Sequence, residues 1–141
     1  MPTLHVTVVT PLEPAQAIRR LTDFGPARAD AFPNVNASGV TVHDQGPGWA
    51  EVTEGNWFAW ERERYTWDAD AGTVSATTLD SNIWALGSGW NYKITAQPPG
   101  SLVEVTARRI GKGIKGRLVA AALAVAGKAM IKSSTAAALK P

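Results

Sequence analysis

The stretch that decides the fold is GRLVAAALAVAGKAMIKSSTAAAL, residues 116–139 near the end of the chain. It contains no proline and is rich in alanine, the best helix former, so it predicts one long helix that ends before Pro141. At about 100° per residue, two opposite sides emerge. The side expected to be buried carries Val119, Leu123, Met130 and Ala137, and the side expected to be solvated carries Arg117, Lys128, Lys132 and Lys140.

Small residues also line the buried side of this helix, at Ala120, Gly127 and Ser134. Such a face cannot fill much volume against a sheet unless the sheet supplies the bulk. The shortage of volume is a first indication of a cavity.

The composition fits one domain, residues 1–141, because 141 residues can bury a core without disulfides. The absence of cysteine favours a reducing compartment, and the N-terminus does not resemble a secretory signal. The longest apolar run, residues 118–127, is shorter than the roughly 20 residues of a membrane span. We therefore expect a soluble, cytoplasmic protein.

Charge is divided unevenly along the chain. All 12 acidic residues and six of the basic ones lie in residues 1–107, whereas residues 108–141 carry eight basic residues and no acidic one. The simpler interpretation is a helix face that is solvated or lies against the acidic sheet. The alternative is a docking module that uses this basic arm on an anionic membrane or an acidic partner; nucleic acid is not expected.

The elements before the helix follow from periodicity and from breakers. Leu4, Val6 and Val8 alternate with polar residues and predict a strand that ends at Pro11. Two short helices follow, from Glu13 through Phe24 and over residues 27–32, before Pro33. Six strands joined by short turns come next, over residues 40–45, 49–54, 56–67, 73–81, 88–96 and 102–109. Such an order predicts an antiparallel meander whose free face is covered by the last helix.

Several motifs resemble the START and Bet v 1-like (SRPBCC) superfamily, and within it the bacterial polyketide cyclase/dehydrase-like group. They are P-x-x-P-x-x-A-I at residues 11–18, WER at 60–62 with YTWD at 65–68, DSN at 80–82 with Trp84, P-G-S-x-V-E-V at 99–105, and GKGIKGR at 111–117 before the alanine-rich helix. The resemblance covers the whole chain, and its motifs are structural. It implies an α+β helix-grip fold, a seven-stranded antiparallel sheet wrapped around the C-terminal helix, with an apolar ligand between them.

Aromatic residues supply the expected cavity wall. Trp90, Tyr92 and Ile94 share one face of their strand, and we expect that face to point at the helix. Together with Leu123 and Met130 of the helix, Trp90 and Tyr92 are predicted ligand contacts.

The strand over residues 57–67 is ambiguous, because each of its two faces holds aromatic residues and a charge pair. Either the strand is bulged near its middle or one charge pair points inward. We expect Phe58, Trp60 and Arg62 to face inward. Arg62 could then hold a carboxylate or enolate oxygen, and the alternative for it is cross-strand pairing with an acid.

Candidate catalytic groups are Asp80, Arg62 and Tyr92. Asp80 shares an alternation face with Thr78, which places both at the predicted pocket, where Asp80 could act as a general base. The alternative is that residues 80–82 only form a turn. His5 and His43 stand without a motif, so neither a nucleophilic triad nor a metal site is expected. Gly111, Gly113 and Gly116 match a dinucleotide fingerprint, but outside a strand-helix-strand unit they indicate a bend, and no cofactor is expected.

Three functions remain open at this point. The first is the binding of a small apolar or aromatic molecule between the sheet and the C-terminal helix. The second is a polyketide cyclase or dehydratase-like enzyme that uses general acid and base groups in the same cavity. The third is the docking module described above. The sequence does not fix the oligomeric state.

Overall fold

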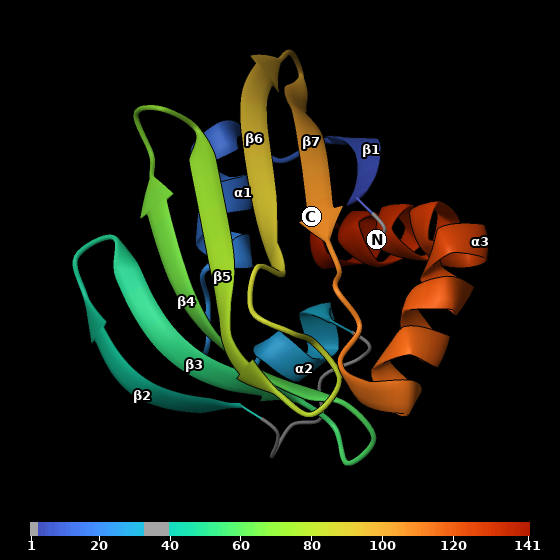
Figure 1. The fold of residues 1–141 in the computed structure, drawn as a ribbon. Helices are drawn as coiled ribbons and strands as arrows, with labels where there is room; N and C mark the ends of the chain where they lie inside the picture. Colours follow the sequence, from blue (N-terminus) through green and yellow to red (C-terminus); the bar gives the residue numbers. More distant parts are fainter. Residues whose placement is uncertain (1–2, 33–39) are drawn as a thin grey trace.

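The computed structural model describes residues 3–32 and 40–141, without the side chains of Ala29 and Asp30. Strand β1 (Thr3–Thr10) leads to two short helices, α1 (Pro14–Leu21) and α2 (Arg28–Ala31). Then come β2 (Thr41–Gly46), β3 (Trp49–Gly55), β4 (Trp60–Asp68), β5 (Thr73–Ser81), β6 (Gly89–Gln97) and β7 (Gly100–Arg108). Helix α3 (Gly113–Ala138) ends the chain (Figure 1). The predicted order of elements is confirmed; Pro33, predicted to end the second helix, lies outside the described residues.

The seven strands form one antiparallel sheet in the order β1-β7-β6-β5-β4-β3-β2. Six of them follow one another as the predicted meander, and β1 closes the β7 edge. The sheet curves strongly, and the helices lie on its inner side and along the β1 edge (Figure 1). Helix α1 contacts β5, β6 and β7, whereas α3 packs mainly on β1 and also touches α2. The inner face is therefore shared between α1 and α3, whereas the sequence suggested α3 alone.

Helix α3 buries small residues, as expected, but the buried arc is rotated from the predicted one. Its buried residues are Gly116, Ala120, Gly127, Ile131, Thr135 and Ala138. Gly127 sits where a Cβ atom would collide with the side chain of Leu4, so the absence of that atom lets the helix approach β1. As a result Leu123 is only half-buried and Met130 is 54% exposed, which corrects the prediction that Met130 is buried. None of the helices among the described residues is both long enough and apolar enough to span a membrane.

Two glycines shape the bend into α3. Gly113 adopts φ +67°, the left-handed region that glycine tolerates, and it starts the helix. Gly116 packs so closely on the backbone carbonyl of Ile83 that an added Cβ would collide with it. The predicted reading of this glycine motif as a bend is confirmed.

The turn between β3 and β4 differs from the predicted strand. Residues 56–59 form a tight turn, in which the backbone N–H of Asn56 donates to the carbonyl of Ala59 at 2.9 Å. The Asn56 side chain accepts hydrogen bonds from the N–H groups of Phe58 and Ala59. Trp57 and Phe58 therefore belong to an exposed turn, and β4 begins only at Trp60.

We expect Gly116→Ala to lower the free energy of unfolding by about 2 kcal/mol, because the new Cβ meets a rigid carbonyl. Gly127→Ala is the matched control: its Cβ meets the mobile end of Leu4, and the gain in helix propensity should keep it within about 1 kcal/mol of wild type. Urea unfolding measures both. Equal losses in the two variants would contradict this account of the bend.

Candidate functional site

Strand β4 presents Glu61, Glu63 and Tyr65 to the inner face, where all three are buried. The structure thus reverses the predicted orientation of this strand. Trp60 is exposed, and Arg62 lies on the outer face 3.5 Å from the carboxylate of Glu51. This is the cross-strand pairing that was the alternative for Arg62.

Phe58 also lies away from the inner face. It is an exposed residue of the β3–β4 turn, and its ring lies under the ammonium group of Lys115, 4.0 Å from the ring centroid. The expectation that Phe58, Trp60 and Arg62 face inward together is therefore wrong.

Asp80 does not share a face with Thr78. The pairing of β4 with β5 shifts between Arg62 and Glu63, so that Glu63 is opposite Thr78 and Arg62 is opposite Asp80. Leu79 is the extra residue of this bulge, and it breaks the alternation on which the prediction relied. Thr78 is buried on the inner face, whereas the Asp80 side chain is exposed on the outer one, 3.8 Å from the Lys112 ammonium group.

One end of the inner face is organised by Arg28 of α2. Its guanidinium donates to both carboxylate oxygens of Glu54, at 2.8 and 3.0 Å, and to the Tyr65 hydroxyl at 2.9 Å. The Tyr65 hydroxyl in turn donates to Glu54 at 2.7 Å. Burial by itself raises the pKa of Glu54, but the Arg28 charge and these hydrogen bonds outweigh it and hold that pKa below its ordinary value. Glu54 is therefore an ionised carboxylate clamped by α2.

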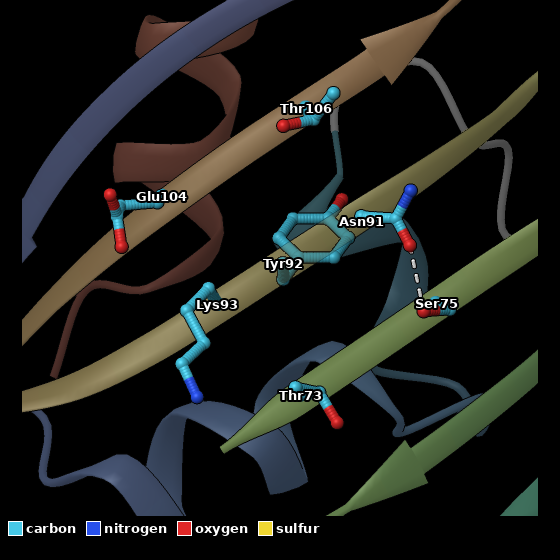
Figure 2. Close-up of a pocket in the computed structure, with 7 residues that line it drawn as sticks. All are labelled: Thr73, Ser75, Asn91, Tyr92, Lys93, Glu104 and Thr106. Atoms are coloured by element: carbon cyan, nitrogen blue, oxygen red, sulfur yellow. Dashed lines mark hydrogen bonds between the residues drawn. The ribbon is translucent and has the colours of Figure 1, made fainter. Parts of the chain in front are cut away.

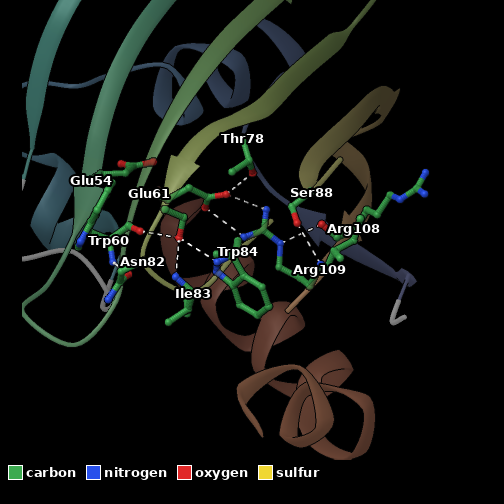
Figure 3. Close-up of polar contacts among 12 residues, drawn as sticks. Glu54, Trp60, Glu61, Thr78, Asn82, Ile83, Trp84, Ser88, Arg108 and Arg109 are labelled. Carbon is green, nitrogen blue, oxygen red and sulfur yellow. Dashed lines mark hydrogen bonds and ion pairs between the residues drawn. The ribbon is translucent and has the colours of Figure 1, made fainter. Parts of the chain in front are cut away.

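A second buried pair stands at the other end of the same row. Arg109 donates to both carboxylate oxygens of Glu61, at 3.0 and 3.1 Å, and Thr78 also donates to Glu61. The Arg109 guanidinium lies 4.9 Å from the ring centroid of Trp84 and 4.7 Å from that of Trp90. Figure 3 shows Arg109 pointing at Glu61 with Trp84 beside it. Arg109 directly follows β7, so this pair also fixes where the chain turns toward α3.

Glu63 lies between these two pairs and has no arginine of its own. It forms a side-chain hydrogen bond with Glu54, but its oxygen Oε2 has no hydrogen-bond partner among the described residues. Burial, followed by the charges of Glu61 and Glu54, raises the pKa of Glu63 well above its ordinary value. The fold thus favours the protonated form of Glu63, whose one proton serves the hydrogen bond to the ionised Glu54, so that Oε2 is left as a hydrogen-bond acceptor.

The predicted aromatic face of β6 does lie on the inner side, but the helix that packs on this strand is α1, whereas α3 was expected. Trp90, Tyr92 and Ile94 pack together against the core on the inner side of the sheet. Burial raises the pKa of Tyr92, the Arg28 charge lowers it, and the charges of Glu63 and Glu54 raise it further. Of the predicted contact residues, the structure brings Thr78, Trp90 and Tyr92 to the inner face, with Leu123 packed against the core from α3.

The outer face carries a shallow, open depression of about 290 Å³, shown in Figure 2. Its lining comes from β5, β6 and β7 and consists of Thr73, Ser75, Asn91, Lys93, Glu104 and Thr106, together with Tyr92, whose ring packs against the core on the inner side. Some of its polar side chains pair locally, as Ser75 with Asn91 at 2.8 Å and Lys93 with the Ala71 carbonyl at 2.6 Å. The buried polar oxygen without a partner among the described residues, Oε2 of Glu63, is on the inner face.

Sequence reasoning missed Glu54, Glu61, Glu63, Arg28 and Arg109. A signal for Glu54 existed: Ala50 and Val52 alternate with polar residues, and the same period of two points Glu54 inward. A short turn after Gly55 then sets Glu54 opposite Glu61. Among the described residues, no group of three His, Cys, Asp or Glu side chains is arranged to hold a metal ion.

Solved structures share this fold across nearly the whole chain. The Zhui aromatase/cyclase from Streptomyces sp. R1128 is 13% identical, with a TM-score of 0.78 over 97% of this chain and 91% of that one. A START superfamily protein from Mycobacterium smegmatis is 12% identical, with a TM-score of 0.60 over 92% of each chain. Ara h 8.0201 is 15% identical, with a TM-score of 0.59 over 98% of this chain and 97% of that one.

No family model and no curated protein matches the sequence. At these low identities the structural likeness shows the fold. The chain has the helix-grip fold of the START and Bet v 1-like superfamily that its motifs resemble.

Arg109→Met should lower the free energy of unfolding by about 3 to 5 kcal/mol, because it leaves the Glu61 carboxylate buried without its partner. Arg64→Met is the matched control, since Arg64 pairs with Glu51 at 3.0 Å on the exposed face, where loss of a pair costs at most about 1 kcal/mol. Chemical denaturation measures both. Equal effects would mean that the Arg109 pair adds nothing beyond a surface contact.

The raised pKa of Glu63 predicts a specific pH dependence. Above the ordinary carboxyl pKa of 4.5, the unfolded chain releases a proton that the folded chain keeps on Glu63. Its contribution to stability is therefore complete below pH 4.5 and is lost as the pH rises toward the folded pKa. Glu54, with a lowered pKa, acts in the opposite sense at acid pH.

Glu63→Gln should remove this loss, so that the variant gains stability over wild type as the pH rises, by up to about 1.4 kcal/mol per pH unit. Denaturant unfolding from pH 4 to about pH 8 measures the difference in the free energy of unfolding between variant and wild type. The effect of Glu54 cancels in this difference because both proteins contain Glu54. A difference that stays constant with pH would show that Glu63 ionises normally.

Proposed function

We propose that the protein binds a small apolar or aromatic molecule between the sheet and α3, and that an oxygen atom of this molecule pairs with Glu63. The observation that carries the proposal is the Oε2 atom of Glu63, which is buried and has no partner among the described residues. An unsatisfied buried polar atom costs about 1 to 3 kcal/mol, and a ligand hydroxyl that donates to Oε2 would recover that cost.

The surroundings of Glu63 suit such a ligand. Tyr92 packs against the core on the same inner face, and the Glu63 charge contributes to its raised pKa. Trp90 and Trp84 border the adjoining Arg109 guanidinium. Mostly apolar walls with a few fixed polar groups are typical of small-molecule sites. The two neighbouring carboxylates already have arginine partners, so the free acceptor of this row among the described residues is the Oε2 atom of Glu63.

The comparisons support the class of ligand. The matching structures include an aromatase/cyclase and a START superfamily protein, and the likeness to them is at the level of fold. We extend the idea of an apolar or aromatic partner to this chain on the strength of the inner-face chemistry.

An enzyme of the cyclase or dehydratase kind is the second candidate, and one observation favours it. Glu63 and Glu54 are hydrogen-bonded carboxyl groups whose pKa values are pushed in opposite directions. Such a split is typical of acid and base pairs. Glu63 would give its proton to a departing hydroxyl group of the substrate, which leaves as water. The Glu63 carboxylate formed in this step would then take the proton lost from carbon, so that Glu63 is protonated again. Of the earlier catalytic candidates, Asp80 and Arg62 lie on the outer face, which leaves Tyr92 beside this pair.

Paired probes test the proposed contact. Wild-type protein should bind 2-naphthol about tenfold more tightly than naphthalene, because the hydroxyl pairs with Glu63. Glu63→Leu should abolish that preference while keeping naphthalene binding, Glu63→Gln should retain most of it, and Arg62→Leu on the outer face should change nothing. Calorimetric titration gives the ratios. A hydroxyl preference that survives Glu63→Leu would refute the contact. If the protein removes water from a bound substrate, and Glu63→Gln stops this reaction while the substrate still binds, the protein is an enzyme of the second kind.

A further inference from the structure

The N-terminal half of the outward side of α3 carries an apolar stripe that faces solvent, and Lys132 lies on the same line seven residues beyond it. Ile114, Leu118 and Val125 are 81%, 68% and 91% exposed. Their spacing of four and seven residues places them on one stripe, opposite the face that packs on β1. A helix that is apolar on both sides is normally covered on both sides.

Two exposed apolar residues belong to loops that are bonded to the start of α3. Trp57 is 88% exposed and Leu86 is 72% exposed. The Trp57 loop is joined to the helix through Phe58, whose carbonyl accepts a hydrogen bond from Lys115. The Leu86 loop is held by the backbone N–H of Lys112, which donates to the carbonyl of Ile83 at 2.8 Å.

Figure 1 shows both loops and the first turns of α3 at the same end of the molecule. We call the five residues Trp57, Leu86, Ile114, Leu118 and Val125 the α3 apolar surface.

Positive charge borders the α3 apolar surface. Arg117 and Lys128 flank the stripe on one side and Lys115 on the other, and residues 108–141 contain no acidic residue. A second copy of this helix would set cations against cations, which disfavours self-association. The charge complement of this surface is therefore anionic.

We propose that the α3 apolar surface docks on an anionic lipid bilayer. The aliphatic side chains and Trp57 enter the interface between headgroups and acyl chains, and Arg117 and Lys128 pair with lipid phosphates. A protein partner would need a shaped pocket or aromatic anchors along the helix, whereas this stripe consists of three aliphatic residues set among alanines. The proposal is independent of what the inner face binds.

Flotation of the full chain with vesicles tests the proposal. The protein should float with an equal mixture of phosphatidylcholine and phosphatidylglycerol, weakly with phosphatidylcholine alone, and less at physiological than at low salt. The triple variant Ile114→Gln, Leu118→Gln, Val125→Gln keeps good helix formers at exposed positions and should lose at least about tenfold in partitioning. Val9→Gln, at a residue 66% exposed on the outer face of β1, is the matched control and should float as wild type does.

Three results would overturn the proposal. Absence of flotation with the mixed vesicles would leave an acidic protein as the occupant of this surface. Wild-type flotation of the triple variant, once circular dichroism shows it to be folded, would mean that charge alone acts. Equal flotation with both vesicle types would remove the role of the cations.

Discussion

The burial of charge on the inner face of the sheet is the constraint on which the rest of the structure depends. Among the described residues, Glu54, Glu61 and Glu63 share this face with the two buried guanidinium groups of Arg28 and Arg109. Each arginine satisfies one carboxylate in a two-point contact. The third carboxyl group has no cation left, so it keeps its proton and offers a free oxygen to the interior.

The same constraint ties the helices to the sheet. Arg28 is the first residue of α2, so its contact with Glu54 anchors the short helix over β3 and β4. Arg109 leaves β7 toward α3, and its contact with Glu61 fixes where that turn begins. The same buried ion pairs therefore position α2 and the start of α3 and supply the charged groups of the inner face. Any ligand there meets an environment whose charges are already balanced, except at Glu63.

Sequence periodicity was sufficient for the architecture and insufficient for the site. The breakers and the alanine-rich stretch gave the order of elements, and the alternation on β6 placed Trp90 and Tyr92 correctly. On β4 both faces carry charge, and hydrophobic pattern cannot rank two such faces. Their orientation depends on partners distant in sequence: Arg28 and Arg109 lie 26 and 48 residues from the glutamates that they pair with. The bulge at Leu79, which turned Asp80 outward, is likewise a feature of strand pairing and leaves no local signature.

Infrared difference spectroscopy of wild type against Glu63→Gln tests most directly the claim that Glu63 is a neutral acid with a free oxygen. At neutral pH we expect a protonated carboxyl C=O band in wild type that is missing in the variant. Binding of 2-naphthol should shift this band to lower frequency, as a new hydrogen bond would. A spectrum with only carboxylate bands, or a band that the ligand leaves unchanged, would contradict the account.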